Sequence, residues 1–387
     1  MKKIPSILSV LFLCGFLSAC KSTALTENHI SKVSSISDAE YILDTLEIDA
    51  DSVFSIFCMI DGMILYFNYE YPKPEETVLT FYKYDIRLNK TYPIGEIPNP
   101  YTFSADYTVN GHKIFFTCNQ LITAGSNPDE QIISPLYVID MDNNNLKKCA
   151  DDASYQTLIY VDMLDHKIIS FKGIVDGDNG ITYLDLFDPS HANHKDFTAF
   201  LTKKYHYDTK KGEAISNFAV WDSVVYVLVN EYNPRRPTAI RIEKYDSFGN
   251  YIGDLRLGKN MAAFLSNQTI CEFNIFGKYG FTRDFSGHGM IFEITSDTAS
   301  AKIINKTELD ISVSGDQKNV IFFSRDSGKI WTLNPQTDQL YRLDSPYEKI
   351  QFICADNDRK MMIQTNQNFD GETVYADIDQ IPAKPVN

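Results

Sequence analysis

The chain has 387 residues, 44% of them hydrophobic, and a formal net charge of −15. This acidity disfavours nucleic acid as a partner, because phosphates are bound mainly through Lys and Arg. The sequence holds no P-loop, GxSxG, HExxH or GxGxxG motif, so no catalytic centre, metal or cofactor can be named from it.

Residues 1–19 are predicted to be a removable signal. Lys2 and Lys3 precede an apolar stretch from Ile4 to Ala19, which is shorter than the roughly 20 residues that span a bilayer as a helix. The stretch ends in Leu17-Ser18-Ala19-Cys20, and this ending resembles a bacterial lipoprotein signal. The resemblance implies a diacylglyceryl thioether on Cys20 and an anchor in the cell membrane or outer membrane, on its extracytoplasmic face. An ordinary secretory signal with an incidental cysteine is the alternative.

Residues 20–38 are rich in Ser and Thr, which predicts a flexible tether between the lipid and a folded domain. From residue 39 to 387 the character changes. Runs of Tyr, Phe, Ile and Val now alternate with turns of Asp, Asn and Gly, the pattern of an all-β domain.

An apolar run, a tight polar turn and a second apolar run occur seven times. The turn positions are Asp61, Asn110, Asp165, Asp222, Gly277, Asp316 and Asp356, at spacings of 49, 55, 57, 55, 39 and 40 residues. A second hairpin follows most copies. Four strands per unit at this period predict a β-propeller, most simply with seven four-stranded blades. Six blades result if the weak copy near Gly277 is not a blade, and a pair of stacked sheets is the structural rival.

The last copy has no outer strand of its own. Tyr41 to Ile48 (YILDTLEI) lies before the first repeat without a partner, so this N-terminal segment is predicted to complete the last blade and close the ring. The strand rhythm resembles lipid-anchored bacterial propellers of the NHL or TolB-like kind. That resemblance implies a fold and no activity.

If the strands of each blade are labelled a to d, the a–b and c–d turns are short, whereas several b–c and d–a connections are long. Both long sets emerge on one end of a propeller, which we call the b–c face; the opposite end is the a–b face. Function is usually carried by loops on a rigid scaffold. The candidate ligand-binding residues are therefore Tyr232, Arg235, Arg236, Arg283, Phe285, His288 and Arg325.

Guanidinium groups bind oxyanions and aromatic rings stack on apolar surfaces, so this set suits an acidic glycan or an acidic peptide. The alternative is that these arginines only neutralise nearby Asp and Glu. Asp176 to Gly180 resembles the start of a calcium loop but has Phe187 where a bidentate Glu is needed, so we expect a turn.

Five cysteines remain beyond the signal and Cys20: Cys58, Cys118, Cys149, Cys271 and Cys354. Three of them lie in apolar runs, where a free cysteine acts as a small core residue. A single disulfide among the five stays open.

The leading functional hypothesis is a non-catalytic ligand-binding or scaffold protein of the cell envelope. The alternative is a polysaccharide lyase or hydrolase, which would bring carboxylates or a histidine together at one mouth of the channel. A third possibility is an assembly subunit that docks on another envelope protein through a flat apolar face.

Overall fold

A computed structural model gives the structure of the chain. It describes residues 32–33, 43–45, 55–73, 76–122, 131–150, 161–176, 179–191, 193–196, 213–231, 238–265, 270–295, 298–302, 308–345, 347–365 and 373–386.

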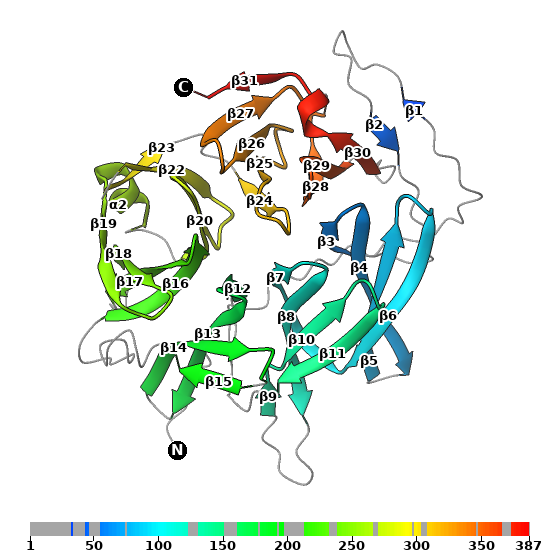
Figure 1. The fold of residues 1–387 in the computed structure, drawn as a ribbon, viewed down its shortest axis with the longest axis horizontal. Coiled ribbons are helices and arrows are strands. Elements are labelled where there is room, and N and C mark those ends of the chain that lie inside the picture. The colour runs from blue at the N-terminus through cyan, green and yellow to red at the C-terminus, as the bar shows by residue number, and fades with distance from the viewer. Residues whose placement is uncertain are drawn as a thin grey trace, which may run out of the picture.

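The chain folds as a β-propeller of seven blades around a central axis (Figure 1). Each blade is an antiparallel sheet in which consecutive strands run from the centre outward. Blade 1 holds β3 (Ser55–Ile60), β4 (Met63–Lys73), β5 (Glu76–Asp85) and β6 (Lys90–Pro98). Blade 2 holds β7 (Pro100–Asn110), β8 (Lys113–Ile122), β10 (Leu136–Asp140) and β11 (Asn145–Ala150), with β9 (Gln131–Ile133) paired to β8. Blade 3 holds β12 (Val161–Leu164), β13 (Lys167–Asp176), β14 (Asn179–Asp188) and β15 (Asn193–Asp196).

The second half of the ring repeats this order. Blade 4 holds β16 (Glu213–Trp221), β17 (Val224–Glu231), β18 (Thr238–Asp246) and β19 (Tyr251–Leu257). Blade 5 holds β20 (Ile270–Phe276), β21 (Tyr279–Asp284), β22 (Gly289–Thr295) and β23 (Thr298–Lys302). Blade 6 holds β24 (Asp310–Val313), β25 (Val320–Phe323), β26 (Ile330–Asn334) and β27 (Gln339–Leu343), and blade 7 begins with β28 (Ile350–Asp356), β29 (Lys360–Thr365) and β30 (Thr373–Asp377).

The N-terminal segment closes the ring as predicted. Strand β2 (Leu43–Thr45) is antiparallel to β30 in the register Leu43 to Ala376, and β1 (Lys32–Val33) adds outside it. Blade 7 therefore combines both ends of the chain. The copy near Gly277 is a complete blade, so the seven-blade prediction is confirmed over six.

Two features at the outer rim were not predicted. A short parallel pairing of β19 with β23 joins blades 4 and 5 into one eight-stranded sheet, beside helix α2 (Lys259–Leu265). The C-terminal strand β31 (Ala383–Pro385) follows a 3-10 turn at Ile378–Gln380 and pairs with the outer strand β27. Its proline, Pro385, fits because a strand at the sheet edge tolerates a residue without an N–H group.

The core lies between blades rather than inside them. Seven separate clusters of buried apolar side chains are found in the described part of the chain, one for each pair of neighbouring blades. The cluster between blades 7 and 1 includes Cys354 and Met362 of one and Met59 and Ile64 of the other. Because every sheet buries both faces, each blade depends on its two neighbours, and the ring is closed by packing as well as by β2.

The c–d turns share one device. The residue that ends strand c accepts backbone N–H groups of the turn through its side chain, as Asp85 accepts from Arg87 and Leu88. The same bond type recurs at the c–d turns of blades 2, 3, 4 and 6, at Asp140, Asp188, Asp246 and Asn334. Asp377 forms it at the start of the 3-10 turn that follows β30. Such Asx turns explain the Asp and Asn in the second hairpin of these five blades.

Candidate functional site

The structure describes four of the seven predicted ligand-binding residues. Tyr232, Arg235 and Arg236 lie outside the described residues. Arg283, Phe285, His288 and Arg325 all lie on the b–c face, where blades 5 and 6 meet.

Arg283 and Arg325 converge on one carboxylate. Asp310, the first residue of β24, accepts a bond from Arg283 through Oδ1 and lies 2.5 Å from Nε of Arg325 through Oδ2. Arg283 also lies 2.8 Å from Oε2 of Glu272 through Nη2. We call Glu272, Arg283, Asp310 and Arg325 the Asp310 cluster. Its two cations and two anions balance, so these arginines do neutralise neighbouring carboxylates, as the alternative interpretation states.

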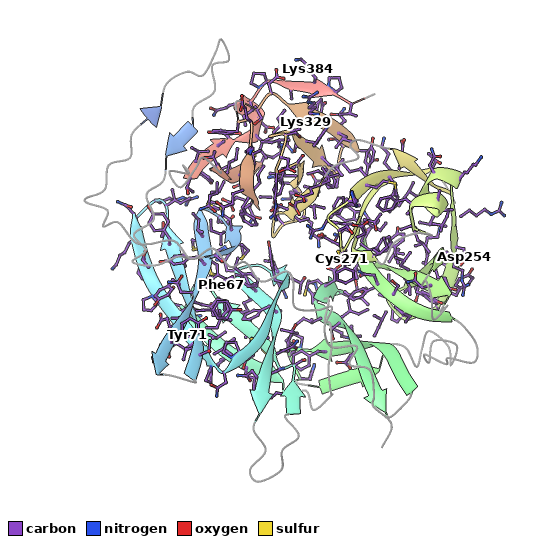
Figure 2. The ribbon with its side chains drawn as sticks, turned by 180° about the vertical axis from the view of Figure 1, so that it is seen from behind. Phe67, Tyr71, Asp254, Cys271, Lys329 and Lys384 are labelled. Carbon is purple, nitrogen blue, oxygen red and sulfur yellow. The ribbon has the colours of Figure 1, made fainter. Side chains whose placement is uncertain are left out.

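A β-bulge in β20 positions Glu272, one of the two carboxylates of this cluster. The register of β20 against β21 shifts between Ile270 and Glu272, so Cys271 is the extra residue and Glu272 faces Arg283 in the ladder. Figure 2 shows Cys271 on the inner side of blade 5, toward the centre of the ring. Inner strands β3, β7, β16 and β28 carry register shifts of the same kind. Bulges re-aim side chains and are frequent beside binding sites.

Arg325 keeps most of its donors for a ligand. Its side chain is 37% exposed, and among the described residues the structure gives its guanidinium one partner, Asp310, on Nε. A guanidinium carries five N–H donors in a planar fork. The Nη side of Arg325 can therefore bind a carboxylate bidentately while Asp310 holds the group in place.

His288 and Phe285 lie in the turn that follows Arg283. Asp284 is buried and accepts the backbone N–H groups of Ser286 and His288 at 2.8 and 2.9 Å, which fixes the turn. Nδ1 of His288 lies 3.4 Å from Oδ2 of Asp284. Phe285 is 52% exposed. A histidine and an aromatic ring are thus presented to solvent beside the Asp310 cluster.

Some of the predicted long loops on this face are hairpins instead. Asp176 pairs with Asn179, and Lys73 pairs with Glu76. The paired strands of blades 1 and 3 therefore extend to within two residues of each other at these b–c connections. On β4, Tyr71 (Figure 2) is 74% exposed. Tyr69 of the same strand is 43% exposed, and sequence reasoning singled out neither residue.

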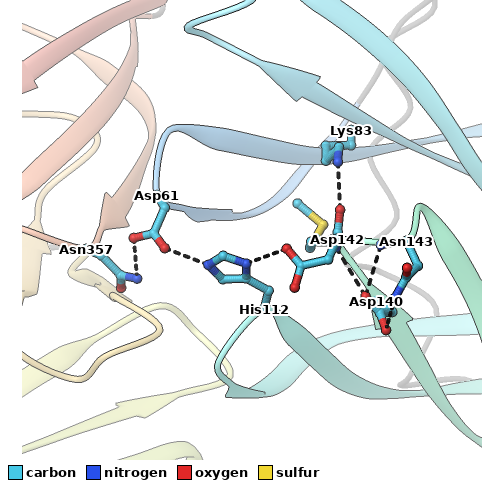
Figure 3. Close-up of polar contacts among 8 residues, drawn as sticks. Asp61, Lys83, His112, Asp140, Asp142, Asn143 and Asn357 are labelled. Atoms are coloured by element: carbon cyan, nitrogen blue, oxygen red, sulfur yellow. Dashed lines mark hydrogen bonds and ion pairs between the residues drawn. The ribbon is translucent and has the colours of Figure 1, made fainter.

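A second polar group lies on the a–b face and was missed entirely. Nε2 and Nδ1 of His112 lie 2.7 Å from Oδ2 of Asp61 and 2.7 Å from Oδ1 of Asp142 (Figure 3). Nδ2 of Asn357 donates to Oδ1 of Asp61 at 2.8 Å. We call Asp61, His112, Asp142 and Asn357 the seam network. The sequence feature that could have indicated this network is the position of its members, which all occupy a–b or c–d turns of blades 7, 1 and 2.

The titration of this network follows from its bonds. The bond to Asp142, then the bond to Asp61, raises the pKa of His112 above its usual value. Burial opposes ionisation of Asp61, but bonds from Asn357 and His112 outweigh it and lower the pKa of that carboxyl. Beside the network, Nζ of the buried Lys83 donates to the carbonyl of Met141 at 2.6 Å and ties blade 1 to blade 2.

One further carboxylate is perturbed. Burial raises the pKa of Asp162 on β12 to about 7, against hydrogen bonds from the backbone of Met163 and Val220. The Val220 bond, 2.9 Å long, joins the inner strands of blades 3 and 4.

Within the described ranges no group of three or more His, Cys, Asp or Glu residues is arranged to hold a metal ion. Cys58, Cys118, Cys149, Cys271 and Cys354 are all free thiols. The part of the chain that the structure describes contains no helix of the length and apolarity needed to span a bilayer.

No family model matches the sequence, and no curated protein matches it. Solved structures are similar to it in fold. An oligogalacturonate lyase in complex with manganese superposes with a TM-score of 0.51 at 8% identity, over 92% of this chain and 96% of that chain. An oligogalacturonate lyase from Vibrio parahaemolyticus gives 0.52 at 10% identity, over 90% and 96%. TolB from Acinetobacter baumannii gives 0.36 at 12% identity, over 84% and 80%.

At these identities the similarity concerns the fold alone. It agrees with a β-propeller, and the NHL or TolB-like subclass stays a prediction.

Proposed function

We propose that the protein is a lipid-anchored β-propeller of the bacterial envelope, tethered through Cys20, whose b–c face binds an acidic oligosaccharide without catalysis. The observation that carries the binding role is Arg325, whose Nε is held by Asp310 while its side chain is 37% exposed. A carboxylate on a sugar is a planar oxyanion that fits this fork. Phe285 offers a ring against which an apolar sugar face can stack.

The acidity of the chain does not oppose this role locally. The Asp310 cluster pairs two guanidinium groups with two carboxylates, so the cluster itself adds no net negative charge beside Arg325. Tyr232, Arg235 and Arg236 are predicted to add to the same face.

The test is calorimetric titration of the full-length protein with oligogalacturonate fragments. Loss of a charged hydrogen-bond pair costs about 1.5–3 kcal/mol, so Arg325→Ala should weaken binding roughly 10- to 100-fold. Arg325→Lys should fall between, since a lysine keeps the charge and loses the fork.

The matched control is Arg359→Ala on the a–b face. Nε of Arg359 is also held by a carboxylate, at 2.8 Å from Oδ1 of Asp379. Equal weakening by the Arg359 and Arg325 variants would contradict a site on the b–c face.

A lyase or hydrolase is the second candidate, because His288 lies beside carboxylates and arginines on one face. Such convergence is what the enzyme hypothesis requires. Turnover of oligogalacturonate, followed with and without Mn²⁺ by the ultraviolet absorbance of unsaturated products for a lyase and by new reducing ends for a hydrolase, separates the two roles. Turnover that is lost in His288→Ala and kept in Arg359→Ala would replace the non-catalytic proposal.

A further inference from the structure

The seam network joins parts of the ring that are distant in sequence. Asp61 lies in the β3–β4 turn of blade 1, His112 in the β7–β8 turn of blade 2, and Asn357 in the β28–β29 turn of blade 7. Asn357 also accepts the backbone N–H of Asp316 from blade 6 at 3.0 Å. The bonds therefore run through four consecutive blades.

This run crosses the interface at which the two ends of the chain meet. Blade 7 is assembled from both chain ends, so its contacts with blade 1 decide whether the ring stays closed. A second bond crosses the same interface, from the backbone N–H of Gly62 to Oδ2 of Asp356 at 2.8 Å.

The geometry fixes the protonation of His112. An ionised carboxylate can only accept hydrogen bonds, and each imidazole nitrogen of His112 lies 2.7 Å from one. Both nitrogens must then carry hydrogen, which makes the ring an imidazolium. Neutral His112 has one N–H group and loses one of the two bonds.

We propose that His112 is a pH-sensitive latch between blades 2 and 1 on the a–b face, which bonds Asp142 and Asp61 at the same time only while its ring is protonated. Asn357 continues the run from Asp61 to blade 7. This role is independent of the ligand site on the b–c face.

The charged groups around His112 agree with this role. Asp61 faces it from blade 1 and Asp142 from the β10–β11 turn, and both favour the imidazolium. Arg87 of the β5–β6 turn faces Asp61 and favours its ionised form. Lys113, next along β8, faces Asp140 rather than the ring.

The pKa shifts of His112 and Asp61 decide how the stability of the latch changes with pH. The raised pKa of His112 means that its contribution is complete below its unfolded value of about 6.5 and is lost as the pH rises through its folded value. The lowered pKa of Asp61 means that its contribution is complete above an unfolded value of about 3.9 and is lost as the pH falls below that. The latch is therefore intact between about pH 4 and pH 6.5.

The experiment compares thermal unfolding of the full chain from pH 4 to pH 9 for wild type, His112→Gln and His166→Gln. His166 is the matched control, because it occupies the same second position of the a–b turn in blade 3, where it is exposed. At pH 5.5, His112→Gln should lower Tm by roughly 2–4 °C. The difference should disappear by pH 9, and His166→Gln should follow wild type throughout.

A second measurement does not depend on that variant. In wild type, the proton NMR resonance of His112 should titrate above its ordinary pKa of about 6.5, and Asp142→Asn should move that titration to lower pH. A His112 resonance that titrates at or below 6.5 would overturn the proposal. So would a Tm loss in His112→Gln that is the same at pH 5.5 and pH 9.

Discussion

The closing strand β2 offers the sharpest test of the architecture. Asp44 lies at the centre of β2, opposite Tyr375 of β30 on one side and Lys32 of β1 on the other. Asp44→Pro removes the backbone N–H group that can pair with one of these two strands. It also fixes φ at a value that is unfavourable in an extended strand. Loss of the three-residue pairing with β30 removes two or three backbone hydrogen bonds, or about 2–3 kcal/mol at a net value near 1 kcal/mol each.

This loss converts to a Tm decrease of roughly 4–12 °C, because 1 kcal/mol shifts Tm by about 2–4 °C in larger domains. Differential scanning calorimetry of the full chain measures it. Asp44→Ala keeps the backbone N–H group and serves as the control. The uncovered edge of β30 should also make Asp44→Pro aggregate at lower protein concentration than Asp44→Ala. If both variants unfold at the wild-type temperature, β2 does not close the ring.

Two further predictions concern the anchor and the inner strands. Cys20→Ser should release the protein from the membrane fraction or leave an unprocessed precursor, because the thioether cannot form. Cell fractionation and immunoblotting measure this. A variant that is processed and still bound to the membrane would refute the lipoprotein prediction. Because burial raises the pKa of Asp162 to about 7, ionisation of this carboxyl lowers the stability of the folded state as the pH rises from about 4 to about 7, by at most about 4 kcal/mol. Asp162→Asn should therefore flatten the plot of Tm against pH between 4 and 7, and an unchanged slope would assign the pH dependence to other groups.

The repeat made the fold predictable. A two-residue turn with positive φ needs residues such as Asp and Gly, and Asp61-Gly62 adopts φ values of 52° and 77°. This local requirement recurs at the same place in other blades, as at Asp165 and Asp222, so turn positions alone located the hairpins. Ring closure by the N-terminal segment followed from counting strands, because one blade lacked its outer strand.

The sites were less predictable because they form between blades. Asp310 and Arg283 are 27 residues apart and belong to different blades, so no spacing along the chain indicates their contact. Asp61 and Asn357 are 296 residues apart. The joining of blades 4 and 5 through β19 and β23 also depends on the geometry of two outer edges, which local sequence does not encode.

The two faces of the ring differ in how their polar groups are used. On the a–b face, side chains of one turn bond the next blade: Asp165 accepts from Ser223, and Asp338 accepts from the backbone N–H of Lys278. These bonds fix neighbouring blades and leave little freedom for a ligand to displace them. On the b–c face, the bulged strand β20 of blade 5 lies beside the Asp310 cluster, and Arg325 bonds Asp310 of its own blade, so its remaining donors are not needed to hold blades together. A ligand that binds there can replace water without breaking the ring, and this is the physical reason for assigning recognition to the b–c face and ring closure to the other.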